Sequence, residues 1–210
     1  MDLGLWLSFA AASAVLVAIP GPTVMLVVGF ALGEGRRSVA ATAPGVALGD
    51  LIATACSLLG LGALMAASGA VFAVVKFAGA AYLVWLGARM LWGARHGAGA
   101  PRAQALRASA SRAKMFRQAF LVTLLNPKAL VFFVAFAPQF IDPTAAYPPQ
   151  AAILVATFTA LGAVNAVLWG LAAGEMRARF ARPGAMALAE RIGGASLIGA
   201  GALTALTSRA

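Results

Sequence analysis

Long apolar stretches dominate the chain, and short segments rich in glycine, proline or charge separate them. A helix of about 20 residues crosses the roughly 30 Å hydrocarbon core of a bilayer, and the apolar stretches approach or exceed that length. The pattern predicts six membrane spans, near residues 5–28, 39–66, 71–92, 116–140, 150–173 and 192–206. The expected fold is therefore an all-α integral membrane protein.

Two of the predicted spans are interrupted by proline. Pro20-Gly21-Pro22 lies within the first span, and Asn126-Pro127 lies within the fourth. A proline inside a helix removes one backbone hydrogen bond and clashes with the preceding turn, so both spans are expected to be broken there. A further proline-rich segment, from Asp142-Pro143 to Pro148-Pro149, is predicted to be a loop between the fourth and fifth spans.

The composition supports this interpretation and excludes a large soluble domain. Hydrophobic residues make up 62% of the 210 positions and charged residues 10%, whereas ordinary globular domains carry roughly 25% charged residues. Six spans of about 20 residues use about 120 positions, so we expect a single transmembrane domain over residues 1–210. The single cysteine, Cys56, excludes an intrachain disulfide and is predicted to be a small buried residue.

The N-terminus could instead be a signal peptide, which needs a basic segment before a short apolar core. Asp2 is the only charged side chain before Glu34, and the apolar stretch continues past Pro22. Residues 1–28 are therefore interpreted as part of the mature chain.

The net charge of +10 comes from basic residues that gather on one predicted face of the membrane. The loops after the first, third and fifth spans emerge on the same side. Thirteen of the 16 Lys and Arg residues fall there, namely Arg36, Arg37, Arg89, Arg95, Arg102, Arg107, Arg112, Lys114, Arg117, Arg177, Arg179, Arg182 and Arg191. Cytoplasmic loops carry such an excess, so both termini are expected outside. The basic residues are interpreted as a topology signal and a contact for anionic lipid headgroups, not for nucleic acid.

Three spans in each half place the two halves upside down relative to one another, and traces of a duplication support this arrangement. Offsets of 115 and 105 residues align matching positions: Lys76–Ala80 with Arg191–Ala195, Asp50 with Asn165, and Pro22 with Pro127. We expect two inverted three-helix repeats, over residues 1–92 and 116–210, joined by a basic cytoplasmic loop over residues 93–115. Inverted repeats with broken helices in corresponding positions are typical of secondary transporters.

Asp50 is the one acidic residue well inside a predicted span. Counting about eleven residues from Val39 at roughly 1.5 Å per residue, it lies about 17 Å deep, near the bilayer midplane. An ionised carboxylate there costs at least ~2.5 kcal/mol, so Asp50 is expected to be protonated, paired or hydrated. It is a candidate proton carrier or partner of a substrate ammonium; the alternative is a structural hydrogen bond across helices. Gly45 and Gly49 would let another helix approach closely.

The two breaks supply candidates for a binding centre. Freed backbone groups at membrane depth are tolerated only inside protein or beside a wet cavity. Two breaks in equivalent spans therefore favour a substrate site over simple kinks, which remain the alternative. The expected substrate-binding residues in the breaks are Pro20, Gly21, Pro22, Asn126 and Pro127.

Three further polar residues complete the set of candidates. Lys128 is the expected buried cation, able to pair with Asp50 or to attract a substrate carboxylate. Asn165 either hydrogen-bonds substrate or joins helices in the core. Lys76 is a shallower charge partner that could equally extend its ammonium to the membrane surface.

The sequence lacks the residues that several other classes of protein require. The sequence has no phosphate-cradling glycine-rich loop, no paired histidine ligands and no nucleophile with a histidine base. We therefore expect no cofactor, no metal site and no enzymatic activity, with transport energy drawn from an ion gradient. A membrane-embedded enzyme would need such residues at membrane depth, and an assembly factor would not need Asp50 together with both breaks.

In this order and spacing, the motifs resemble the LysE family of bacterial amino-acid exporters, especially its homoserine/threonine-resistance branch. The resemblance covers the whole chain and rests on Ile19-Pro20-Gly21-Pro22, Gly35-Arg36-Arg37, Gly45 to Asp50, Lys76 to Gly87, Asn126-Pro127-Lys128, Phe132-Phe133 and Pro138-Gln139-Phe140. It implies six spans, the inverted repeat, a location in the inner membrane, and amino-acid efflux driven by the proton gradient. This chain has Thr23 where relatives often carry Asn or Asp after the Pro-Gly-Pro motif. The resemblance therefore does not assign the chain to a subgroup with a particular substrate.

The expected partners are thus an amino-acid substrate, protons and the lipid bilayer, and the chain could form a homodimer. An exporter of metal ions or other small solutes on a related fold is the alternative function. The sequence leaves open which amino acid is moved, and whether Asp50 carries the proton or contacts the substrate.

Overall fold

The computed structural model describes residues 1–67 and 110–175, together with scattered residues of 74–92 and 191–206. In these parts all regular structure is helical and no strand occurs, which confirms the all-α prediction. Most of the third and sixth predicted spans lies outside the described residues, as does Lys76.

The first predicted span is two helices, α1 (Leu3–Ala18) and α2 (Pro22–Glu34), which bend by 52° at the break between them. The Asp2 side chain caps α1 by accepting a hydrogen bond from the Leu5 backbone N–H at 3.0 Å. Pro22 occupies the first position of α2, where the missing N–H costs no helical hydrogen bond. The predicted interruption is confirmed.

The fourth predicted span is interrupted at the corresponding place, although Arg112–Ala135 continues as one candidate membrane span. It consists of α6 (Arg112–Leu124) and α7 (Pro127–Ala135), followed by the short 3-10 helix η2 (Ala137–Phe140). Pro127 opens α7 as Pro22 opens α2. Both breaks therefore place a proline at the start of the second half-helix.

Two long helices correspond to the second and fifth predicted spans. After the 3-10 turn η1 (Arg36–Ser38), α3 runs over Val39–Ala67, and α8 runs over Tyr147–Glu175. Pro148 and Pro149 lie in the first turn of α8, so the prediction that they belong to the loop was wrong. A first turn accepts proline because its N–H groups have no partner within the helix.

In the described part of the chain, three helical segments are long and apolar enough to cross a membrane, and the bent pair of α1 and α2 would make a fourth. Large apolar side chains are exposed on their outer faces, among them Leu3, Leu7, Val15, Leu51, Leu59, Leu121, Leu125, Val164 and Leu168. Such surfaces suit lipid and not water. Cys56, which we predicted to be buried, is exposed, because a small apolar residue of a membrane helix can face lipid as readily as protein.

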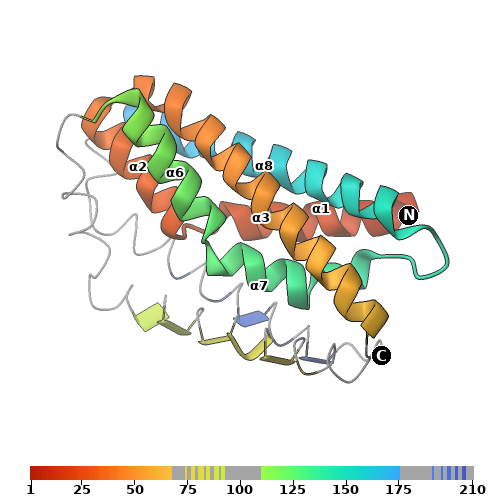
Figure 1. Cartoon of the computed structure of the whole chain (residues 1–210). Helices are drawn as coiled ribbons and strands as arrows, with labels where there is room; N and C mark the ends of the chain where they lie inside the picture. The colour runs from red at the N-terminus through yellow and green to blue at the C-terminus, as the bar shows by residue number, and fades with distance from the viewer. Residues whose placement is uncertain are drawn as a thin grey trace.

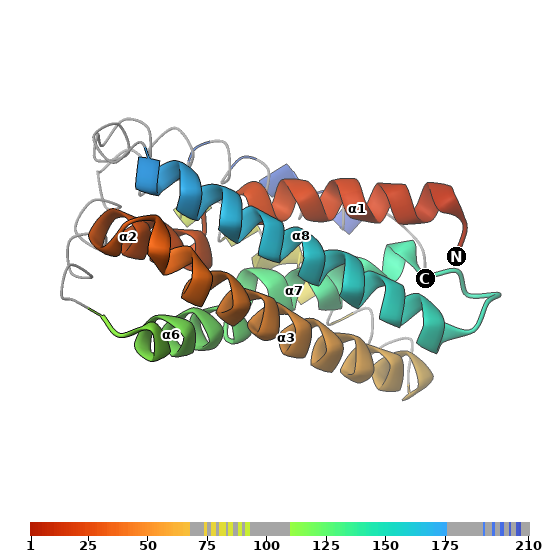
Figure 2. The same ribbon diagram turned by 90° about the horizontal axis from the view of Figure 1, so that it is seen from above.

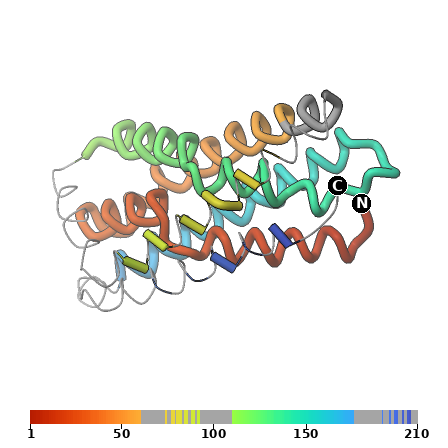
Figure 3. Tube along the Cα trace, turned by 90° about the horizontal axis from the view of Figure 1, so that it is seen from below, coloured from red at the N-terminus to blue at the C-terminus, as the bar shows by residue number. Residues whose placement is uncertain are grey.

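α3 and α8 run along the bundle, whereas α1 with α2 and α6 with α7 form end-to-end pairs (Figures 1 and 2). The tube view shows both breaks near the middle of the bundle (Figure 3). α3 packs against α6 as expected, because Gly45 and Gly49 leave no space: an added Cβ would lie 2.6 Å from the Phe116 carbonyl oxygen and 2.8 Å from Thr123 Cβ, respectively. These contacts bring the centre of α3 to the break between α6 and α7.

Polar contacts link segments at both ends of the bundle. At one end Arg36 forms a 2.9 Å ion pair with Glu175, and Glu34 accepts a hydrogen bond from the Ala110 backbone N–H. These contacts join the ends of α2 and α8 to the segment before α6, so the described basic residues near them gather at this end. At the other end the Tyr147 hydroxyl donates to the Leu58 carbonyl, beside the loop that precedes α8.

An aromatic cluster fixes α7 against α1 and α8. Its rings lie 4.8–6.2 Å apart between centroids, mostly tilted or edge to face, which is the favoured geometry of aromatic pairs. The members are Phe9, Phe132, Phe133, Phe136, Phe140 and Phe158. The cluster fills the core on one side of the breaks and holds the start of α7 in place.

Candidate substrate site

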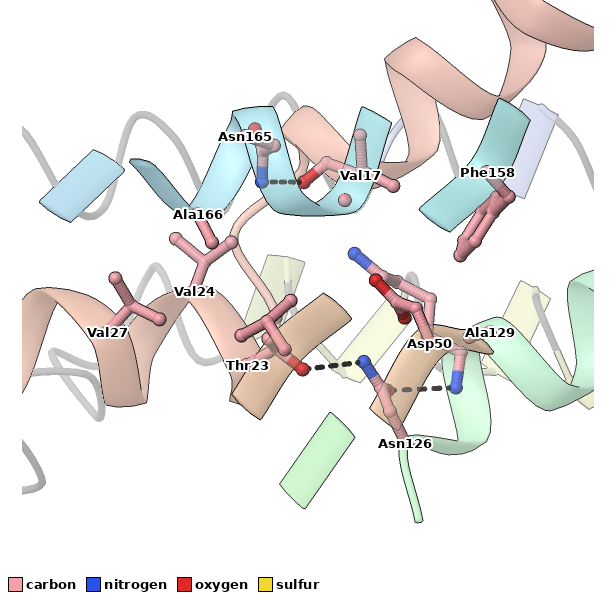
Figure 4. A pocket seen from close by; sticks show the side chains of 14 residues that line it. Val17, Thr23, Val24, Val27, Asp50, Asn126, Ala129, Phe158, Asn165 and Ala166 are labelled. Atoms are coloured by element: carbon pink, nitrogen blue, oxygen red, sulfur yellow. Dashed lines mark hydrogen bonds between the residues drawn. The ribbon is translucent and has the colours of Figure 1, made fainter. Parts of the chain in front are cut away.

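A small cavity lies where the two breaks meet, with room of about 30 Å³. Its described lining comes from α1, α2, α3, α7 and α8 and from the residues of both breaks (Figure 4). Five candidates predicted from the sequence line it: Gly21, Asp50, Asn126, Lys128 and Asn165. Pro20, Pro22 and Pro127 form the breaks beside it and are not among the described lining residues.

Asp50 projects from α3 into this cavity and is 5% exposed. Among the described residues no donor forms a hydrogen bond to its carboxylate, so the structural bridge considered as an alternative is not seen there. Gly162 of α8 lies against it, since an added Cβ at this glycine would overlap Asp50 Oδ2 and lie 3.2 Å from Cγ. The missing side chain at residue 162 is what gives the carboxylate its room.

Lys128, in the first turn of α7, is 6% exposed and reaches across to the other broken span. Its Nζ donates to the carbonyl oxygens of Leu16 and Ile19, each at 2.9 Å. These carbonyls belong to the last turn of α1, which the break leaves without helical donors, and a cation is favoured at a helix C-terminus.

The expected pairing of Lys128 with Asp50 is not a direct ion pair in this structure. Among the described residues no ion pair within 4.0 Å joins them, although both line the same cavity. The cavity thus holds one acid and one base that do not neutralise each other by direct contact.

Asn126 and Thr23 form a second link between the breaks. Asn126 Oδ1 accepts from the Lys128 backbone N–H at 3.1 Å, and its Nδ2 donates to Thr23 Oγ1 at 3.2 Å. Thr23 Oγ1 also accepts from the Thr123 hydroxyl at 3.2 Å. Each broken span therefore supplies a side chain, Thr23 or Lys128, that binds the break of the other.

Thr23 stands out in the sequence only as a departure from related chains, and its place in the site was not predicted. A signal was present, because the offset of 105 residues that pairs Pro22 with Pro127 also pairs Thr23 with Lys128. Gly162 was missed as well, and nothing in the sequence marks it among the other glycines.

Asn165 holds the same end of α1 as Lys128 does. Its Nδ2 donates to the Val17 carbonyl oxygen at 2.8 Å, as Figure 4 shows. Its amide is thus engaged with backbone, and the residue also lines the cavity.

The described lining combines one acid, one base, amide groups and apolar side chains. Asp50 is the one acid among these residues, and no group of three or more His, Cys, Asp or Glu in the described segments could hold a metal ion. Apolar side chains, among them Val24, Val46 and Phe158, make up most of the remaining wall.

Broken membrane helices that meet at a cavity with one acid and one base define a membrane transport protein. The model of the LysE type translocator family matches residues 14–208, and the chain belongs to this family. This confirms the family predicted from the motifs, and the protein is a translocator and not an enzyme.

Several relatives share a large part of the chain. An uncharacterized membrane protein of Vibrio cholerae is 33% identical over 210 residues, or 98% of each chain. A homoserine/homoserine lactone efflux protein of Salmonella typhimurium is 34% identical over 167 residues, covering 80% of this chain and 78% of the relative. A leucine efflux protein of Enterobacter sp. is 31% identical over 142 residues, covering 68% and 66%. No solved structure is a significant match.

Proposed function

We propose that the protein exports amino acids from the cytoplasm across the bacterial inner membrane, in exchange for protons. The observation that carries this proposal is the cavity at the two breaks, where Asp50 and Lys128 are both buried and do not contact each other as an ion pair. A zwitterionic amino acid offers one cation and one anion to such a site. The names of two relatives, a leucine efflux protein and a homoserine/homoserine lactone efflux protein, support the same substrate class.

The proposed architecture is one transmembrane domain with six spans in two inverted repeats, over residues 1–92 and 116–210. In its support, α1, a break, α2 and α3 follow one another in the first half as α6, a break, α7 and α8 do in the second. The basic end of the bundle faces the cytoplasm in this proposal, because cytoplasmic loops carry the excess of Lys and Arg. Both termini then lie outside.

Proton exchange follows from the single carboxylate. Asp50 can hold a substrate ammonium when it is ionised, or a proton, but not both at once. Asp50 therefore releases the substrate to one face of the membrane and then takes up a proton from that same face. We assign to Asp50 this coupling role, and to Gly21, Asn126, Lys128 and Asn165, with the flanking Pro20, Pro22 and Pro127, the surroundings of the bound substrate.

The small size of the cavity implies that the helices must separate during transport. A space of about 30 Å³ admits a water molecule, which needs at least roughly 10–15 Å³, but not an amino acid. The structure therefore corresponds to a closed conformation. Opening toward either face has to loosen the links that Lys128 and Thr23 make between the two breaks.

The proposal is tested by reconstituting the purified protein in proteoliposomes and measuring uptake of a panel of labelled amino acids, with a divalent cation series alongside. Neutral amino acids such as leucine or homoserine should accumulate when an outward-directed proton gradient is imposed on inside-out oriented vesicles. Empty liposomes provide the control. Transport of the cations alone would instead support an exporter of metal ions, and transport of neither would refute the proposed function.

A further inference from the structure

The half-helices α2 and α7 begin at the two breaks, and their N-termini are capped differently. In α7 the side chain of Asn126 caps the helix by accepting from the Lys128 backbone N–H at 3.1 Å. In α2 the capping position is Gly21, and no side chain makes a capping hydrogen bond. The offset of 105 residues pairs these two positions, so the repeat has a cap on one side and an open helix end on the other.

The open end of α2 faces the cavity. Gly21, Thr23 and Val24 all line it. The first N–H groups of a helix have no partner within it and carry a partial positive charge, and together they attract anions. Pro22 contributes no donor, so the N–H groups of Thr23 and Val24 are the ones available in this turn.

The Lys128 ammonium lies beside the N-terminus of α2. A Cβ added at Gly21 would come 3.3 Å from Lys128 Nζ, so the ammonium borders the helix end directly. An ammonium has three donors, and two of them are used on the Leu16 and Ile19 carbonyls. The third remains for a ligand, and this side of the cavity is positive.

Asp50 supplies the negative charge of the cavity. Its carboxylate is more than nine-tenths buried, lines the same cavity and accepts no hydrogen bond from the described residues. A buried polar group is ordinarily paired, so this carboxylate indicates a cationic ligand within reach of the open helix end.

We propose that the N-terminus of α2, with Lys128, is the subsite for the carboxylate of the substrate, and that the substrate ammonium binds Asp50. This inference rests on the proposed function and gives the amino acid one orientation: its carboxylate toward the first break and its ammonium toward α3 and α8. The substrate side chain is then left to the apolar wall. Asn126 keeps its capping role on α7 and is not a carboxylate ligand.

The capping difference provides the test. Gly21→Ser adds a hydroxyl that can cap α2 as Asn126 caps α7, since serine is a preferred N-cap residue. It thereby competes with a substrate carboxylate for the same N–H groups. Gly21→Ala adds the same Cβ without the oxygen, so it measures the steric effect alone. The two variants are compared by equilibrium binding of leucine and homoserine, and of the amide of each, to purified protein in detergent.

We expect the full-length wild-type protein to bind each amino acid about tenfold or more tightly than its amide, as a charge-assisted hydrogen bond predicts. Relative to Gly21→Ala, Gly21→Ser should bind the amino acids about tenfold more weakly, and the preference over the amides should largely disappear. The Ser variant should be at least as resistant to thermal unfolding as the Ala variant, which separates blocked binding from misfolding.

The failure of this inference can be told apart from the failure of the proposed function. Equal binding of amino acids and amides by the wild-type protein, or equal affinities in the Ser and Ala variants, would overturn the carboxylate subsite while amino-acid export stands. If the wild-type protein neither binds nor transports any amino acid, the proposed function and the subsite are both wrong.

Discussion

Replacing Gly162 by alanine should displace the carboxylate of Asp50 and lower both stability and transport. The added Cβ would overlap Oδ2 and lie 3.2 Å from Cγ, so the buried Asp50 side chain would have to turn away from α8. Inserting one extra carbon into a packed site costs about 1–3 kcal/mol. This exceeds the gain of up to about 1 kcal/mol that alanine brings over glycine inside a helix.

A double-mutant cycle with Asp50→Ala isolates the collision. Truncation at residue 50 leaves only its Cβ, 3.9 Å from the carbon added at Gly162, which is ordinary contact. Gly162→Ala should therefore be harmless or slightly stabilising in that background, giving a coupling energy of about 1–3 kcal/mol. Thermal unfolding in detergent measures this coupling energy, because each kcal/mol shifts the Tm by about 2–4 °C in a chain of this size. Gly60→Ala is the matched control, because nothing lies within 4 Å of a Cβ there.

Equal effects of Gly162→Ala with and without the Asp50 side chain would refute the reasoning. They would mean that the carboxylate does not occupy the space beside α8. A wild-type transport rate in the single variant would likewise show that the position of Asp50 against Gly162 is irrelevant to function.

Three further changes probe the breaks and the orientation. Pro127→Ala supplies a backbone N–H at residue 127 and removes the proline ring, which would let α6 continue into α7; it should slow transport while membrane insertion stays normal, and wild-type efflux would show that the break is only a kink. Thr23→Val removes the acceptor of two hydrogen bonds and should destabilise the protein by about 1–3 kcal/mol, measured by thermal unfolding, whereas unchanged stability would contradict the link. In a Cys56→Ala background, a cysteine at Ala145 should react with an impermeant thiol reagent applied to intact cells, and one at Ser111 should not; the reverse would invert the topology.

The helix breaks could be predicted because their cause is local. A proline constrains its own turn whatever surrounds it, so Pro22 and Pro127 were sufficient to place the starts of α2 and α7. Asp50 was equally evident, since one carboxylate within an apolar stretch has few explanations. These features follow from composition and position along the chain alone.

The partners of these residues could not be predicted, because they depend on how the helices pack. The sequence suggests an ion pair between Lys128 and Asp50, but the break leaves carbonyls on α1 that the ammonium satisfies first. Gly162 acquires its importance only from the register of α8 against α3. The missing side-chain cap of α2 becomes evident only when it is compared with α7, which Asn126 caps.

The coupling role of Asp50 leads to a prediction about the driving force. Asn at residue 50 keeps the shape of the side chain but cannot bind and release a proton. Asp50→Asn should therefore abolish accumulation driven by a pH gradient in proteoliposomes. Downhill exchange of substrate should persist at a reduced rate, because losing the charge on a hydrogen-bond partner weakens ammonium binding by about 1.5–3 kcal/mol.

Asp142→Asn supplies the matched control, with the same chemical change outside the spans. The Thr144 hydroxyl and backbone N–H donate to the Asp142 carboxylate at 2.6 and 2.8 Å and hold the pKa of this carboxyl below its usual value. Asp142 therefore stays ionised at the pH of transport and cannot carry protons, so gradient-driven accumulation should be unchanged in this variant. Full accumulation in Asp50→Asn at matched protein levels would exclude Asp50 as the proton carrier. Loss of substrate binding together with exchange would show instead that its carboxylate is needed chiefly for the substrate ammonium, and the proton would then have to bind at another group.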